Sequence, residues 1–118
     1  MVLLVCGGRD YADRGKVFKT LDSVKDPVDL LVQGGADGAD RTARAWAEAR
    51  GVWCVEVPAL WQRHGRFAEP KRNLFMLEVA KQLAVPGEPN LVAFPGGSET
   101  KNMIKVAKDA GLVVWEVK

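Results

Sequence analysis

The sequence comprises 118 residues, 47% of them hydrophobic and 27% charged, with a formal net charge of +2. This length predicts a single domain over residues 1–118, and the near-neutral charge does not favour nucleic acid or a membrane surface as partner. No apolar run reaches the roughly 18 residues of a membrane helix. The two cysteines, Cys6 and Cys54, lie in strand-like runs without metal-ligand spacing. We therefore expect a cytoplasmic protein with no metal or cofactor.

Apolar runs typical of buried strands alternate along the chain with segments whose apolar residues recur at helical spacing. The predicted strands cover residues 2–6, 30–33, 52–57, 91–94 and 112–117. The predicted helices cover 14–25, a segment ending at Arg50, a segment from about Pro70 to Leu83, and a last segment that Gly111 ends. Loops are expected at 58–69 and 85–90.

This alternation predicts an α/β fold, a Rossmann-like three-layer sandwich around a five-stranded parallel sheet with helices on both faces. The expected strand order is 3-2-1-4-5. In such sheets ligands bind beyond the carboxyl ends of the strands, where the strand order reverses. The first and fourth strands would flank that point.

Three of the predicted strands end in double glycines, Gly7-Gly8, Gly34-Gly35 and Gly96-Gly97, and each is followed by a predicted helix. A glycine turn brings backbone N–H groups close to a ligand, and a helix N-terminus adds partial positive charge. The three turns would meet at one edge of the sheet. They predict a site for a phosphate-bearing molecule, and Cys6 is placed to line it.

Polar residues beside these turns have two possible roles. Ser98 is expected to cap the last helix, or to bind phosphate through its hydroxyl as Thr100 could. Asp37 or Asp40 is expected to cap the second helix, with a ribose or metal contact as the alternative. Arg9 and Asp10, after the first turn, either contact the ligand or form an internal ion pair.

The segment 61–73 supplies further candidates. Pro70 is predicted at the first helical position, which places Lys71 and Arg72 in the first turn, where the macrodipole disfavours cations. Arg72 could clamp a phosphate with two parallel hydrogen bonds. Trp61 and Phe67 either stack on a base or hold the loop against the core. Tyr11 could serve as a lid.

Taken together, four motifs resemble the small YspA-like (cpYpsA-related) branch of the SLOG superfamily of Rossmann-like proteins, over nearly the whole chain. The motifs are Gly7-Gly8-Arg9-Asp10-Tyr11, Gly34-Gly35-Ala36-Asp37-Gly38-Ala39-Asp40, Pro58-Ala59-Leu60-Trp61 through Arg72-Asn73 to Met76, and Phe94-Pro95-Gly96-Gly97. The resemblance implies a nucleotide or nucleotide-derived ligand. It also implies a possible homodimer, with Trp46 or Phe75 on the contacting helix faces, and an origin in bacteria or phages.

The chain also bears a distant resemblance to cytokinin-activating phosphoribohydrolases of the same superfamily, which cleave nucleoside monophosphates. Arg72 and Met76 match one of their motifs, and the turn 95–100 matches most of the other. However, Glu99 replaces a glycine, and Met103 stands where the catalytic glutamate is expected. This departure removes a main part of the hydrolase mechanism.

The resulting prediction is a module that senses or sequesters a small nucleotide-type (phosphoribosyl-containing) ligand. The predicted ligand-binding residues are Gly7, Gly8, Arg9, Asp10, Gly34, Gly35, Ala36, Asp37, Asp40, Trp61, Arg72, Asn73, Pro95, Gly96, Gly97, Ser98 and Thr100. One alternative is an N-glycosidic hydrolase with Glu99 or Asp40 as acid/base and Arg72 orienting the phosphate. The other is a single-stranded nucleic-acid binder, which would use Arg63, Arg66, Lys71 and Arg72 with Trp61 and Phe67.

Overall fold

The computed structural model describes residues 1–83 and 87–118. Its strands are β1 (Val2–Cys6), β2 (Leu30–Gln33), β3 (Trp53–Glu56), β4 (Leu91–Ala93) and β5 (Val114–Glu116). Its helices are α1 (Arg14–Asp22), α2 (Ala39–Arg50), α3 (Trp61–His64), the 3-10 helix η1 (Gly65–Phe67), α4 (Ala68–Leu83) and α5 (Ser98–Asp109). Part of the loop expected at 85–90 lies outside the described residues.

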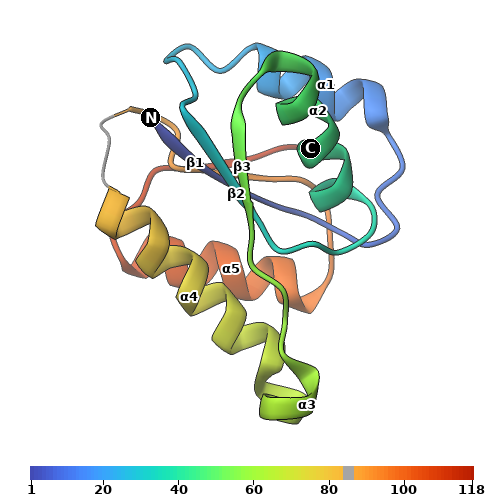
Figure 1. Ribbon diagram of the computed structural model, residues 1–118, viewed down its shortest axis with the longest axis vertical. Coiled ribbons are helices and arrows are strands. Elements are labelled where there is room, and N and C mark those ends of the chain that lie inside the picture. The colour runs from blue at the N-terminus through green and yellow to red at the C-terminus, as the bar shows by residue number, and fades with distance from the viewer. Residues whose placement is uncertain (84–86) are drawn as a thin grey trace.

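The five strands form one parallel sheet in the order β3-β2-β1-β4-β5, which confirms the predicted fold class and strand order. The central strand β1 pairs with β2 on one side and with β4 on the other. Successive strands are therefore added on one side of β1 up to β3 and on its other side from β4 onwards. The carboxyl ends of β1, β2 and β4 lie side by side (Figure 1).

Side chains alternate along β1 between two hydrophobic cores. Leu3 and Val5 pack with α1 and α2 on one face, whereas Val2 and Leu4 pack with α4 and α5 on the other. Figure 1 shows these two helical layers on either side of the sheet. Because both faces are covered, β1 is buried along most of its length and fixes the position of the turn that follows it.

The predicted loop at 58–69 is instead largely helical. The N–H groups of Arg63 and His64 donate to the carbonyl of Leu60 and close the turn of α3, and Gly65, at φ +53°, ends it. Helix α4 begins at Ala68, so Pro70 occupies its third position rather than the first. Proline is tolerated there because the first four N–H groups of a helix have no intrahelical acceptor.

Two other expectations change. Helix α1 ends at Asp22 rather than Lys25, because the hydroxyl and the N–H of Ser23 both donate to the carbonyl of Thr20. Trp46 cannot be a homodimer contact, since it is buried and its indole N–H donates to Asp22 at 2.8 Å. Phe75 is 60% exposed, so a dimer through that residue stays a prediction.

Within the described part of the chain, no helix is both long and apolar enough to cross a membrane.

Candidate functional site

A cavity of about 390 Å³ lies at the carboxyl ends of β1 and β2, beside the turn that follows β4. Most of the predicted ligand-binding residues line it: Gly7, Gly8, Arg9, Gly34, Gly35, Ala36, Asp37, Asp40, Trp61, Arg72, Asn73, Gly97 and Thr100. Glu99 and Cys6 line it as well. The structure thus brings together residues from all three glycine turns and from α4, whereas Asp10, Pro95, Gly96 and Ser98 lie outside the lining.

The glycine turns contact one another closely. The N–H of Gly8 donates to the carbonyl of Pro95 at 2.9 Å, and the carbonyl of Gly8 accepts from Ala39 N–H at 3.3 Å. A Cβ on Gly8 would come within 2.9 Å of the Pro95 oxygen. The N–H of Gly35 is also occupied, because it donates to the side chain of Gln33. These glycines therefore shape the turns, and the N–H groups of Gly8 and Gly35 are already engaged by the protein.

Helices α2 and α5 begin beside the cavity, after Gly38 and Gly97 respectively. Across residues 1–83 and 87–118, no side chain makes a capping hydrogen bond to either helix, so the predicted capping roles are wrong. Ser98 is the first residue of α5 itself, and Asp37 pairs with Arg41 at 3.2 Å. The first N–H groups of both helices thus lack intrahelical acceptors and carry partial positive charge toward the cavity edge.

Asp40, the second residue of α2, is only 5% exposed. Its Oδ2 accepts from the N–H of Ala36 at 3.2 Å, whereas its Oδ1 has no hydrogen-bond partner among the described residues. Burial raises the pKa of Asp40 from 3.8 to about 6, although the Ala36 N–H and the nearby Arg72 oppose this shift. Asp40 therefore lines the cavity, and one of its buried carboxylate oxygens has no hydrogen-bond partner among the described residues.

Arg72 lies next to Asp40 and is held from several directions. Its Nη1 donates to the carbonyl of Gly34 at 3.1 Å, and its Nε donates to Asn73 Oδ1 at 2.9 Å. Burial lowers the pKa of Arg72 somewhat, with Asp40 acting in the opposite direction. Arginine has five N–H donors, and these bonds within the described residues use two. The side chain lines the cavity with donors to spare.

Glu69 was missed by the sequence reasoning. It is 5% exposed and lines the cavity, where it pairs with Arg9 at 2.5 Å and lies 4.0 Å from Arg72. Arg9 therefore pairs with Glu69 rather than with Asp10. The only signal available was spacing, because residues three apart on a helix share a face and Glu69 precedes Arg72 by three.

The side chain of Asn73 is hydrogen-bonded to other groups of the protein. Its Nδ2 donates to the backbone carbonyl of Glu99 at 3.2 Å and to Asn102 Oδ1 at 3.0 Å, while its Oδ1 accepts from Arg72. It is almost fully buried. Asn73 thus joins α4 to the first turn of α5, and we regard it as a residue that positions both Arg72 and that turn.

Of the two residues at which the chain departs from the hydrolase motif, Glu99 borders the cavity and Met103 does not. Met103 is fully buried in the core formed with α4 and α5, so its position offers no polar group to the cavity. Glu99 is exposed on the first turn of α5 and borders the cavity. Burial raises the pKa of the Cys6 thiol well above its ordinary range, and this does not favour a nucleophilic thiolate.

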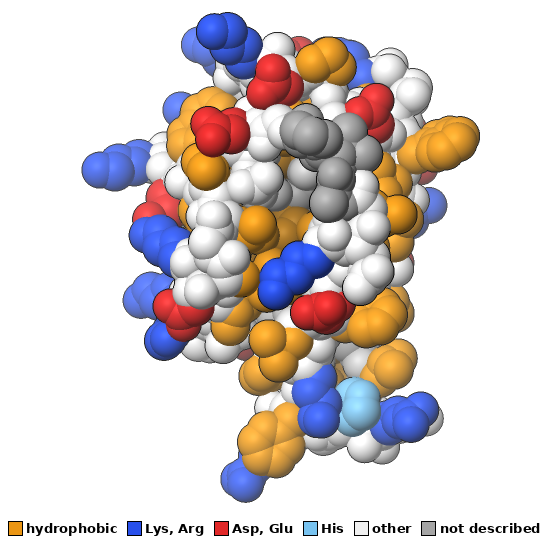
Figure 2. All heavy atoms as spheres, turned by 90° about the vertical axis from the view of Figure 1, so that its left-hand side faces the viewer, with side chains coloured by type: hydrophobic (Ala, Val, Ile, Leu, Met, Phe, Trp, Pro, Cys, Tyr) orange, Lys and Arg blue, Asp and Glu red, His pale blue; other side chains and the backbone are white. Residues whose placement is uncertain are grey.

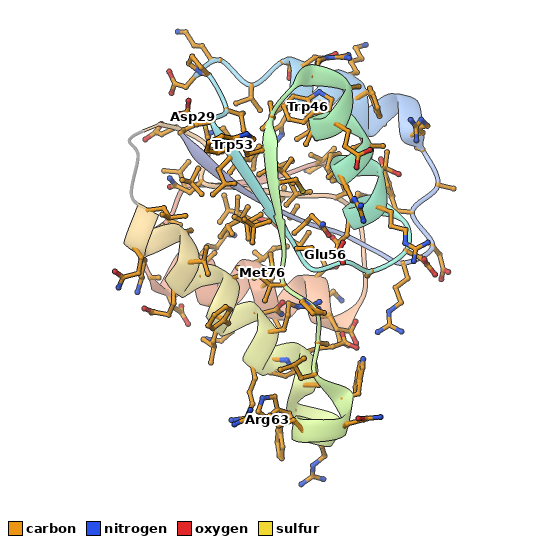
Figure 3. All side chains as sticks on the ribbon, in the orientation of Figure 1. Asp29, Trp46, Trp53, Glu56, Arg63 and Met76 are labelled. Carbon is orange, nitrogen blue, oxygen red and sulfur yellow. The ribbon has the colours of Figure 1, made fainter. Side chains whose placement is uncertain are left out.

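Helix α3 and η1 project from the body of the molecule. Figure 2 shows the histidine at this end beside basic and hydrophobic side chains, and Figure 3 places Arg63 there, well away from Glu56 and Met76. Phe67 is exposed under the guanidinium of Arg66, at 4.9 Å, and so does not hold the segment to the core. Trp61 is half exposed and borders the cavity, whereas Tyr11 packs on Phe94 at 5.5 Å and lies outside the lining.

The strand order and the crevice at the reversal of the sheet place the chain among Rossmann-like α/β proteins. Residues 1–64 match the family described as "YspA, cpYpsA-related SLOG family". The chain is also similar to the Gene 61 protein of Mycobacterium phage D29, at 31% identity over 122 residues that cover 95% of this chain and 92% of that protein. The chain belongs to the YspA, cpYpsA-related SLOG family, and this membership suggests a role in binding a nucleotide-related ligand.

Proposed function

We propose that the protein binds a small phosphorylated, nucleotide-type ligand in the cavity at the carboxyl edge of the sheet, as a sensor or a sequestering module. The observation that carries this proposal is that two helix N-termini without side-chain caps and the largely buried side chain of Arg72 all border one cavity of about 390 Å³. Such a combination favours a compact anion, because backbone dipoles and a guanidinium all present donors.

In this arrangement the phosphate lies against the first turn of α5, and its oxygens accept hydrogen bonds from N–H groups of the turn that ends at Gly97. Arg72 supplies charge and a planar pair of donors, and Glu69 and Asn73 keep its side chain in place. Trp61 borders the cavity with half its surface exposed, which suits stacking on a base. The ligand is thus held at its phosphate and covered at its base.

The proposal is tested by titration calorimetry of nucleoside 5′-monophosphates with the wild-type protein and Arg72→Ala. Loss of the guanidinium should weaken binding by about 10- to 100-fold, the usual effect of removing a hydrogen bond to a charged group. Arg72→Lys keeps the charge but not the fork, and should also bind more weakly. Arg44→Ala, at an exposed arginine on α2, is the matched control. Equal affinities in all four proteins would contradict the proposal.

A second candidate, N-glycosidic hydrolysis of nucleoside monophosphates, is favoured by one observation. Asp40 lies in the cavity with a pKa of about 6, which suits general acid catalysis near neutral pH. Met103 supplies no carboxylate from the core, so Asp40 or Glu99 would have to act. Release of free base by the wild type and its loss in Asp40→Asn or Glu99→Ala would support this function. Retention of full release in both variants would exclude the assignment.

A further inference from the structure

The unpartnered oxygen of Asp40 is the feature of the cavity that the proposed function does not yet use. Buried carboxylate oxygens are nearly always hydrogen-bonded, since leaving one without a donor costs free energy. Among the buried side-chain polar atoms of the described residues, Asp40 Oδ1 alone lacks a partner. Asp40 is 5% exposed and is one of the residues that line the cavity.

The surroundings of Asp40 favour a neutral donor. Arg72 already lies close enough to offset the charge of the carboxylate, and the N–H of Ala36 holds its other oxygen. Two more carboxylates of the lining are paired with arginines, Asp37 with Arg41 and Glu69 with Arg9. The described residues contain no group of three or more side chains suited to a metal ion. A hydroxyl group matches this site better than a cation does.

The position of Asp40 relative to the first turn of α5 indicates which hydroxyl this is. The carboxylate of Asp40 lies beside Gly34, which directly follows β2, whereas α5 begins after β4, and β1 runs between β2 and β4. Two strand spacings amount to about 10 Å. This distance suits a phosphorylated pentose with one hydrogen bond at each end, whereas a base would extend farther from the phosphate.

We infer that Asp40 Oδ1 accepts a hydrogen bond from a ribose hydroxyl of the ligand, and that the site thereby distinguishes ribonucleotides from deoxynucleotides. The inference rests on the proposed function, because it assumes a phosphate at the first turn of α5. It assigns Asp40 a role in specificity that requires no chemical step. A 2′- or 3′-deoxy ligand would leave Oδ1 buried without a donor.

The test compares the four ribonucleoside 5′-monophosphates with their 2′-deoxy and 3′-deoxy forms by titration calorimetry. The wild type should bind one of the two deoxy forms about 10- to 100-fold more weakly than the parent, since the lost bond is to a charged acceptor. In Asp40→Asn and Asp40→Ala this preference should shrink to about threefold or less. Glu48→Gln, at an exposed carboxylate of the same helix outside the cavity lining, should keep the full preference.

Two results would overturn the inference while the proposed function stands. One is wild-type protein that binds the parent and both deoxy forms within about threefold of one another. The other is a preference for the ribonucleotide that persists in both Asp40 variants, because the hydroxyl would then contact another group. Failure of the wild type to bind any of the monophosphates would overturn the proposed function as well. Asp40→Asn keeps the size of the side chain, so the comparison remains possible if Asp40→Ala does not fold.

Discussion

The guanidinium of Arg72 lies directly over Gly34. Nη1 of Arg72 donates to the Gly34 carbonyl at 3.1 Å, and a Cβ on Gly34 would overlap Nη1 and come within 2.9 Å of Cζ. The same Cβ would be 3.1 Å from Asp40 Oδ2. Glycine at this position therefore allows an arginine from α4 and an aspartate from α2 to approach the end of β2 together.

Gly34→Ala should consequently displace Arg72 and abolish most ligand binding while the fold survives. Because the obstructing atoms belong to the end of a flexible side chain, we expect a stability loss of only about 1 kcal/mol. Thermal unfolding and calorimetry with nucleoside monophosphates measure the two effects. The control is Gly15→Ala in α1, which should leave binding unchanged and stabilise the protein slightly, since alanine favours helix over glycine. Unchanged binding in Gly34→Ala would contradict the role given to Arg72.

Asp40 should make the stability of the unliganded protein depend on pH. Its pKa is raised from 3.8 to about 6, so the folded state holds the proton more tightly than the unfolded state. The stabilisation from this group is complete below about pH 4 and is lost as the pH rises through 6. The loss is at most about 3 kcal/mol. Arg72, Glu56 and Cys6 are the other titratable groups that face Asp40, and Arg72 reduces the effect.

The measurement is urea unfolding of the wild type and Asp40→Asn between pH 4 and 7.5. The difference between the two proteins cancels the titration of all other carboxylates. Asp40→Asn should gain stability relative to the wild type as the pH rises through 6. A difference that stays constant over this range would show that Asp40 titrates normally.

Asn73→Ala should reduce stability by about 1–3 kcal/mol, because it leaves partners on α4 and α5 without their hydrogen bonds. It should also weaken nucleotide binding, since Arg72 loses its contact at Nε and the first turn of α5 loses its link to α4. Asn102→Ala removes only one of these bonds and should have a smaller effect on both measurements. If the two variants behave alike, Asn73 does not position the site.

The projecting segment α3–η1 provides a test against nucleic-acid binding. Replacing Arg63 and Arg66 together by alanine should leave the affinity for nucleoside monophosphates unchanged, because both lie outside the cavity lining. A single-stranded oligonucleotide bound through this segment would instead lose affinity in the double variant and would do so steeply with salt in the wild type. That second pattern would favour the nucleic-acid alternative.

The sequence predicted the sheet order well because the strands are short, mostly apolar runs, of which β1, β2 and β4 are buried between helices, and a double glycine follows each of these three. It did not predict the burial of Glu69, since an acidic residue before Pro70 looks like an ordinary first-turn residue. Nor did the sequence predict that the N–H of Gly8 donates to the carbonyl of Pro95, because the two residues lie far apart in the chain. The sequence also left open whether Trp46 is buried or lies at a dimer contact, because helical periodicity does not reveal that its indole N–H donates to Asp22. These misses all concern long-range polar contacts.

Mass spectrometry of a nucleotide panel after incubation with the protein and filtration is the most direct test of nucleotide binding in the cavity. We expect that the wild type retains at least one phosphorylated nucleotide-type compound, which is recovered intact on denaturation, and that Arg72→Ala does not retain it. If every compound passes through the filter unchanged with the wild type as with the variant, the cavity at the carboxyl edge of the sheet is not a nucleotide site.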